Sequence, residues 1–200
     1  MEIYRYPHFP THLSVVHVAL FTNVSNSAAL RSRIVKAATL AAPEGDIERE
    51  AINYAFIDAR LITSMLHLQT AIYQAILFDS QKSLRTRTVH SEILWCLNPT
   101  NNISEAIRRY GVSDTSSALF VVRITSPDLV DVESGMKCVV EGNIVPQNTL
   151  QELTDWSSIK KYYKLNVEPA VKEAAGDDVR ERAIIDNIVV SSVAMKSVMA

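Results

Sequence analysis

Short apolar segments alternate with amphipathic ones along this chain. Runs rich in aliphatic and aromatic residues predict strands at 13–21, 52–58, 92–97 and 118–124. Apolar positions at helical spacing predict helices at 27–40, 59–78, 103–110 and from Asp177 to the C-terminus. Strands that alternate with helices are typical of the α/β class. We therefore expect one compact domain over residues 1–200, with a small mixed sheet flanked by helices and a helical C-terminal part.

Two stretches of the pattern predict irregular backbone. Residues 41–51 hold Pro43, Gly45 and several acidic residues, so we expect a solvated, flexible loop there. Gly135 is expected to break the helical stretch that follows Pro127. At the start of the chain's first helix, Asn23 or Ser25 is the expected cap.

The most informative stretch runs from residue 84 to residue 124. A basic entry, RTR at 85–87, leads into the apolar segment EILWCL at 92–97, which predicts a strand. The polar turn NPTNN at 98–102 then opens a short helix. Where a strand ends and a helix begins, ligands meet free backbone N–H groups and the positive end of the helix dipole. The turn is therefore a candidate binding site.

Composition and charge narrow the range of functions. Hydrophobic residues make up 48% of the 200 residues and the net charge is −2, so nucleic-acid binding would need a local basic patch. Such a patch exists at 82–109, with five basic residues against two acidic ones, whereas 128–181 is acidic. With two cysteines and no signal-like or membrane-like segment, we expect a protein of the cell interior with reduced thiols.

Recognisable catalytic and metal-binding motifs are missing from the sequence. The five glycines form no dinucleotide or phosphate loop, and there is no G-x-S-x-G elbow. His90 and Glu92 match one half of a zinc deaminase signature, but the cysteine half is absent. Cys96 is expected to be a buried structural thiol. We therefore expect no catalytic residue, no metal site and no cofactor.

Two polar surfaces remain as binding candidates. Arg85 and Arg87, with Lys82 nearby, form either an ordinary exposed loop or a phosphate contact site. In the turn, Asn98, Thr100 and Asn101 are candidate ligand contacts. The alternative is that Thr100 or Asn102 merely caps the helix, with Glu105 close to its positive end. The sequence leaves open whether the two surfaces face one ligand or lie at opposite ends of one strand.

The last helix is the third candidate surface. Its apolar residues cover most of its circumference, which requires burial on more than one side. One side is expected to face the sheet; the other faces either the chain's own core or a partner protein. These residues are Ile184, Ile185, Ile188, Val189, Val190, Val193, Met195 and Val198.

Four blocks of this sequence form a distinctive set: AFIDARLI at 55–62, TAIYQAI at 70–76, RTRTVHSEILWCLNPTNNISEAIRRYGV at 85–112 and IKKYYKL at 159–165. In their order and spacing they resemble one known family, the small kinase-binding subunit of the KEOPS (or EKC) complex, which includes the PRPK-binding protein and its fungal counterparts. Residues 41–50 and the tail after Ser191 depart from the family pattern.

The resemblance implies a compact α/β protein that is not an enzyme. It implies direct binding to the small atypical kinase/ATPase subunit of KEOPS, and indirect association with the carbamoyltransferase and other subunits. The complex makes threonylcarbamoyl-adenosine at position 37 of tRNA, and in fungi it is linked to telomere maintenance and transcription. The implied location is the nucleus, including telomeric chromatin, and the cytoplasm, with no membrane association.

The resemblance also assigns roles to residues. A single-stranded tRNA acceptor end presents phosphates and unstacked bases, which arginines and polar groups hold well. The implied tRNA contacts are Arg85, Arg87, Asn98, Thr100, Asn101, Lys82 and Arg109. The implied kinase-facing residues are Ile184, Ile188 and Val189 of the last helix, with Leu30 and Ile34 of the first helix beside them. The rival hypotheses are a free-standing RNA-binding module and an enzyme with an unrecognised site.

Overall fold

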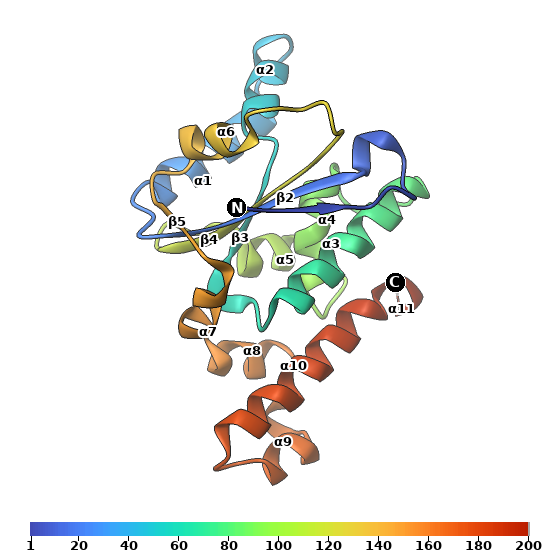
Figure 1. The fold of residues 1–200 in the computed structure, drawn as a ribbon, viewed down its shortest axis with the longest axis vertical. Helices are drawn as coiled ribbons and strands as arrows, with labels where there is room; N and C mark the ends of the chain where they lie inside the picture. Colours follow the sequence, from blue (N-terminus) through green and yellow to red (C-terminus); the bar gives the residue numbers. More distant parts are fainter. Residues whose placement is uncertain (200) are drawn as a thin grey trace.

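A five-stranded sheet lies between two layers of helices in the computed structural model, which describes residues 1–199 (Figure 1). The two long strands pair in the middle, and shorter strands pair with their outer edges in the order β1-β2-β4-β3, with β5 also on β2. Their bounds are β1 Glu2–Arg5, β2 Val15–Thr22, β3 Ala55–Asp58, β4 Ala118–Thr125 and β5 Asn143–Val145. The predicted α/β class with a small flanked sheet is confirmed. The sheet is antiparallel in every pairing of the described strands, where a mixed sheet was expected.

Helices cover both faces of this sheet (Figure 1). On one side lie α1 Ser27–Thr39, α2 Glu44–Ala51 and α6 Val132–Val139. On the other lie α3 Met65–Ser80, α4 Val89–Leu97, α5 Ile103–Tyr110 and α10 Asp178–Ala194. Along β2, Val18 and Leu20 pack in the core below the sheet, while Ala19 and Phe21 pack in the core above it. Because both faces are covered, the central strands are apolar at nearly every position, as their sequences indicate.

The strand predicted at 92–97 is wrong, because these residues form most of helix α4. Thr88 caps this helix: its hydroxyl accepts the Ser91 N–H at 3.1 Å, and the Ser91 hydroxyl accepts the Thr88 N–H at 3.2 Å. The helix packs against α3, α5, β3 and β4, so it is buried on nearly every side. A helix buried all round has no polar stripe, and a short apolar run of this kind is indistinguishable by periodicity from a buried strand.

The flexible loop predicted at 41–51 is also wrong over most of its length, because α2 occupies 44–51. Two of its acidic side chains form ion pairs with nearby arginines: Glu48 pairs with Arg33 of α1 at 2.5 Å, and Asp46 pairs with Arg49 at 2.6 Å. These ion pairs and the packing of α2 against α1 hold the segment in helical form.

Gly135 does not break the helix in which it lies, since α6 runs through it. A Cβ at Gly135 would lie 2.6 Å from the hydroxyl of Tyr54, so the glycine permits a close approach instead. The cap of α1 also differs from the expectation. Asn26, and neither Asn23 nor Ser25, stands at the N-cap, and its amide donates to the carbonyl of Val139 at 3.0 Å.

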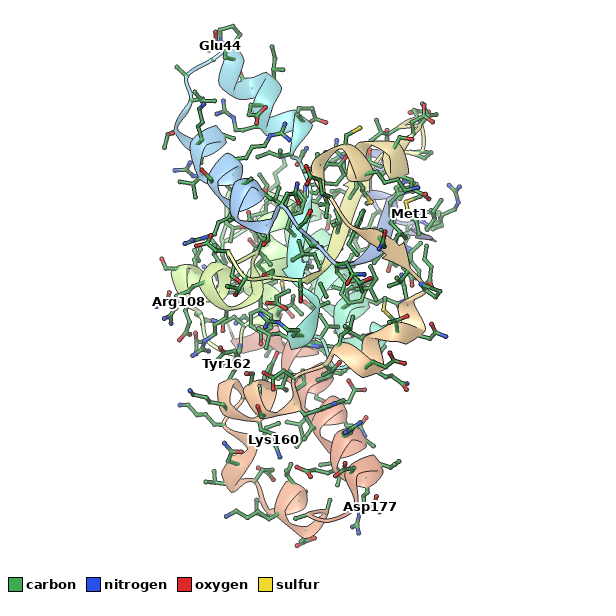
Figure 2. The ribbon with its side chains drawn as sticks, turned by 90° about the vertical axis from the view of Figure 1, so that its left-hand side faces the viewer. Met1, Glu44, Arg108, Lys160, Tyr162 and Asp177 are labelled. Atoms are coloured by element: carbon green, nitrogen blue, oxygen red, sulfur yellow. The ribbon has the colours of Figure 1, made fainter. Side chains whose placement is uncertain are left out.

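The C-terminal part is helical, as predicted, and its short helices extend the layer below the sheet. Their bounds are α7 Leu150–Leu153, α8 Trp156–Tyr162, α9 Pro169–Glu173 and α11 Lys196–Met199. Lys160 and Asp177 lie toward one end of the molecule, and Glu44 of α2 lies at the opposite end (Figure 2). Among residues 1–199, no helix is both long and apolar enough to cross a bilayer.

Candidate functional site

The basic loop before α4 is wrapped around a buried carboxylate. Glu92 has no exposed surface, and it accepts the Arg85 N–H at 3.0 Å, the Thr86 N–H at 2.7 Å and the Thr86 hydroxyl at 2.6 Å. The loop's backbone donors are thus directed inward, toward Glu92. The side chains of Arg85 and Arg87 are exposed, and neither makes an ion pair with any residue in 1–199. Two free guanidinium groups therefore stand on a loop of defined shape.

A hollow of about 500 Å³ lies beside Arg87, at the N-terminal end of α4. His90 and Arg123 contribute to its wall and are themselves almost fully buried. The Nε2 of His90 accepts the Ile124 N–H at 2.9 Å, and burial lowers the pKa of His90 to about 3. His90 is therefore neutral at physiological pH and accepts a hydrogen bond from the backbone of β4 beyond the point where β3 ends.

The turn at 98–102 is built around Asn98, which has no exposed surface. Its Nδ2 donates to the hydroxyl of Thr100 at 2.8 Å, and its Oδ1 accepts from Arg109 at 3.3 Å. Asn98 is thus part of the frame of the turn and offers no surface to a ligand, which corrects its predicted role as a contact. Thr100 and Asn101 are exposed and remain candidates.

The first turn of α5 already carries a negative charge at its positive end. Asn102 is the N-cap and accepts the Glu105 N–H at 2.9 Å. Glu105 accepts the Thr100 hydroxyl at 2.5 Å. This hydrogen bond and, to a lesser extent, one from Asn98 hold the pKa of the Glu105 carboxyl below its usual value. Capping by Asn102 is therefore confirmed. Because Glu105 occupies the helix terminus, the turn suits a neutral hydrogen-bonding ligand better than an anion.

The two polar surfaces lie at opposite ends of α4, which answers the question that the sequence left open. The loop at 85–87 precedes this helix and the turn follows it. Nine helical residues separate them by about 13 Å, from a rise of ~1.5 Å per residue. One small ligand does not span that distance, but an extended chain of several units does.

Lys82 and Arg109, the remaining two predicted tRNA contacts, differ in how accessible their side chains are to a ligand. Lys82 is exposed, in a left-handed backbone conformation directly after α3. Arg109 is half-buried: it pairs with Glu105 at 2.7 Å and stacks 4.4 Å above the ring of Tyr162. Its charge is therefore committed within the protein. Arg108, its neighbour, is exposed on the same side of the molecule as Tyr162 (Figure 2).

The structure separates the five residues predicted to face the kinase. Val189 is fully buried in the core below the sheet, and Leu30 is 2% exposed in the core above it. Ile34 also packs above the sheet, whereas Ile184 and Ile188 are half-buried below it. Helices α1 and α10 lie on opposite faces (Figure 1), so Leu30 and Ile34 do not lie beside the last helix as expected.

Among the buried charged residues, two that shape the polar surfaces were missed from the sequence. Glu92 was read only as part of an incomplete deaminase motif, although a lone carboxylate in an apolar segment is itself a signal that it has partners. Lys196 is 4% exposed and donates to the carbonyl oxygens of Asn98 at 2.7 Å and Thr100 at 2.9 Å. Nothing in the sequence near Lys196 predicts that contact. Within residues 1–199, no group of three or more His, Cys, Asp or Glu is arranged to hold a metal ion.

Comparison with known proteins gives a consistent result. The family described as kinase binding protein CGI-121 matches residues 21–197. A protein of Cryptococcus neoformans, named EKC/KEOPS complex subunit CGI121, is 33% identical over 228 aligned positions, which cover 96% of this chain and 100% of that protein. Proteins with the same name from Aspergillus fumigatus and Neurospora crassa are 38% and 31% identical; the alignments cover 82% and 98% of this chain, and 84% and 98% of those proteins. This chain therefore belongs to the CGI-121 family of kinase binding proteins.

Proposed function

We propose that this chain is a non-catalytic subunit of an EKC/KEOPS complex, in which it binds the small atypical kinase/ATPase subunit and helps to recruit tRNA. The observation that carries the proposal is the family match over residues 21–197, together with relatives of that name aligned over nearly their whole length. The surfaces described above supply a physical basis for each binding event.

The tRNA part of the proposal rests on the basic loop and the turn at the two ends of α4. Arg85 and Arg87 are exposed cations without an ion-pair partner in residues 1–199, suited to the phosphates of a single strand. Asn101 offers hydrogen-bonding groups suited to an unstacked base, and the exposed Thr100 lies beside it with its hydroxyl bonded to Glu105. The separation of about 13 Å along α4 fits an extended nucleic-acid chain. Its phosphates would contact the loop at 85–87, and a base farther along the chain would contact the turn at 98–102.

Charge reversal at the loop tests the tRNA part. Arg85→Glu with Arg87→Glu should weaken the binding of tRNA at fixed, moderate salt. The slope of log K against log salt should also become shallower by about 1.4, from ~0.7 for each lost single-strand contact. The matched control is Lys172→Glu with Arg180→Glu, an equal charge change on exposed side chains at the α9–α10 end. A tRNA without its single-stranded acceptor end should bind the wild-type protein weakly. The tRNA part would be refuted if the loop variant bound tRNA as tightly as the wild type and the control variant, and if the wild type bound the shortened tRNA as tightly as the intact one.

The kinase part rests on one stripe of helix α10. Ile184 and Ile188 are half-buried, and Met195, which follows the helix, is 49% exposed. Spacings of four and seven residues place the three on one side of the helix. Ile185, Val189 and Val193 occupy the adjacent side and are buried. A graded apolar stripe beside a buried face is suited to a protein partner.

Co-elution of the full chain with the kinase subunit tests the kinase part. Ile188→Arg and Met195→Arg should each abolish co-elution, because a charge would then be desolvated in an apolar contact. Val179→Arg is the control, since Val179 is 81% exposed on another side of α10. Circular dichroism should show that the variants are folded. If Ile188→Arg is not folded, the co-elution of Met195→Arg alone tests the kinase part. Co-elution of Met195→Arg as efficient as that of Val179→Arg would contradict the assignment of this stripe.

Other expectations raised by the resemblance stay predictions. They are a role in threonylcarbamoyl-adenosine formation at position 37 of tRNA, indirect contact with the carbamoyltransferase, links to telomere maintenance and transcription, and a nuclear and cytoplasmic location. The rival enzymatic hypothesis requires turnover by the purified chain alone.

A further inference from the structure

Lys196 is an unusual residue for the interior of a protein. It follows α10 closely, at the start of α11, and is 4% exposed. Removing an ammonium group from water is costly, and burial lowers the pKa of Lys196 from its usual value to about 8. The group stays mostly protonated at neutral pH, so the protein must supply compensating contacts.

The contacts of this ammonium group lead to the last part of α4 and to the turn after it. It donates to the carbonyl oxygens of Asn98 at 2.7 Å and Thr100 at 2.9 Å, and it lies 4.4 Å from the centre of the Trp95 ring. The indole N–H of Trp95 donates to the carbonyl of Asn101 at 3.3 Å. Lys196 and Trp95 therefore hold three carbonyl groups of the turn inward, and the Nδ2 of Asn98 adds a longer bond, at 3.2 Å, to the carbonyl of Thr100.

This arrangement determines what the turn presents to solvent. A trans peptide unit is planar, so the N–H of Asn101 points opposite to the carbonyl of Thr100. Because Lys196 holds that carbonyl inward, the Asn101 N–H points outward, and it finds no acceptor among the described residues. The exposed side chains of Thr100 and Asn101 flank this donor.

We propose that Lys196 is a positioning residue, which holds the turn at 98–102 so that the N–H and the side-chain amide of Asn101 bind the hydrogen-bonding edge of an unpaired nucleobase. The inference rests on the proposed tRNA function and names the ligand group for this part of the site. A phosphate is disfavoured there, because the carboxylate of Glu105 lies against Thr100. Lys196 itself does not touch the ligand.

Lys196→Met tests this inference in the full-length protein, because it keeps the length and the apolar stem of the side chain and removes the donors. Amide hydrogen exchange at 98–102 should become faster in the free protein, since the carbonyl groups lose their clamp. Affinity for tRNA at fixed salt should fall by about tenfold, the loss expected for one well-placed hydrogen bond to a charged or fixed group. The salt slope should stay unchanged, because no phosphate contact is removed.

Lys160→Met is the matched control. It removes another partly buried ammonium group, which lies away from the turn. The Nζ of Lys160 is 2.7 Å from the carboxylate of Glu181, with which it forms an ion pair. Lys160→Met should change neither the exchange at 98–102 nor the affinity for tRNA. If Lys196→Met does not fold, Lys196→Gln is the second variant: its shorter, uncharged amide cannot reproduce both carbonyl bonds, so it should show smaller changes in the same direction.

The outcomes separate this inference from the proposed function. Unchanged exchange at 98–102 in Lys196→Met would refute the clamp. Faster exchange with unchanged tRNA affinity, while the Arg85 and Arg87 reversal weakens binding, would refute the role of the turn and leave the tRNA function standing. Unchanged affinity in both the Lys196 and the arginine variants would refute the tRNA function itself, and the ligand part of the inference with it.

Discussion

Two of the buried histidines, His67 and His90, should make this protein sensitive to mild acid. His67 of α3 is fully buried, and its Nδ1 accepts the Thr63 N–H at 3.3 Å; His90 of α4 is 5% exposed and accepts the Ile124 N–H at 2.9 Å. Burial lowers the pKa of each to about 3. In the unfolded chain the pKa returns to about 6.5.

The direction of the effect follows from proton binding. Between about pH 6.5 and pH 3 the unfolded chain binds protons that the folded chain does not, so stability is complete above pH 6.5 and falls as the pH falls. pH 5 lies about 1.5 units below the pKa of a histidine in the unfolded chain. At ~1.36 kcal/mol per unit, each histidine therefore lowers the free energy of unfolding by about 2 kcal/mol at this pH. The pair accounts for about 4 kcal/mol, a large share of a typical ~5–15 kcal/mol for a domain.

Urea unfolding at pH 7.5 and pH 5.0 measures this directly. The wild-type protein should lose about 4 kcal/mol more between the two pH values than the double variant His67→Gln/His90→Gln, and each single variant should account for about half. His12→Gln is the control, because His12 is exposed. If the double variant loses as much stability as the wild type, the histidines are not buried in the neutral form and the reasoning fails.

Two further substitutions test the frames of the polar surfaces. Glu92→Gln should speed amide exchange at Arg85 and Thr86 and weaken tRNA binding severalfold, because the new NH₂ group opposes the loop's donors; protection as strong as in the wild type would contradict the role given to Glu92. Asn102→Ala should lower the free energy of unfolding by about 1 kcal/mol through loss of the α5 cap, and Asn102→Asp should restore it despite its charge near Glu105. A stable alanine variant would show that Glu105 alone secures this helix end.

Elements with a local signal were predictable from the sequence. The helix at 103–110 was predicted because a polar N-cap, an acidic first turn and a terminal glycine surround a short amphipathic segment, and all these features act within one helix. The central strands were predicted because both are apolar, β-branched and short. The last helix was predicted from Asp177, whose side chain accepts the Arg180 N–H at the helix start.

Elements whose state depends on distant neighbours were predicted wrongly. Residues 92–97 have no periodicity because α3, α5 and the sheet surround α4, and such a run fits a buried strand equally well. Residues 44–51 are helical because α1 supplies Arg33 to Glu48 and a surface to pack against. The strand β5 was missed because its three residues are a strand only through pairing with β2.

The candidate site divides in the same way. The sequence by itself determined the inventory: Arg85, Arg87, Thr100 and Asn101 as solvent-facing polar groups, a cap at the start of α5, and the resemblance to a kinase-binding family. Those features are local, because they depend on residue type and on neighbours within one or two turns. The tertiary structure alone decided that the loop and the turn stand at opposite ends of α4, since the length of that helix separates them. It also decided that Lys196, 96 positions along the chain from Thr100, holds the turn in place. A contact between residues so far apart in sequence depends on how α10 packs against α3, and no local pattern encodes that packing.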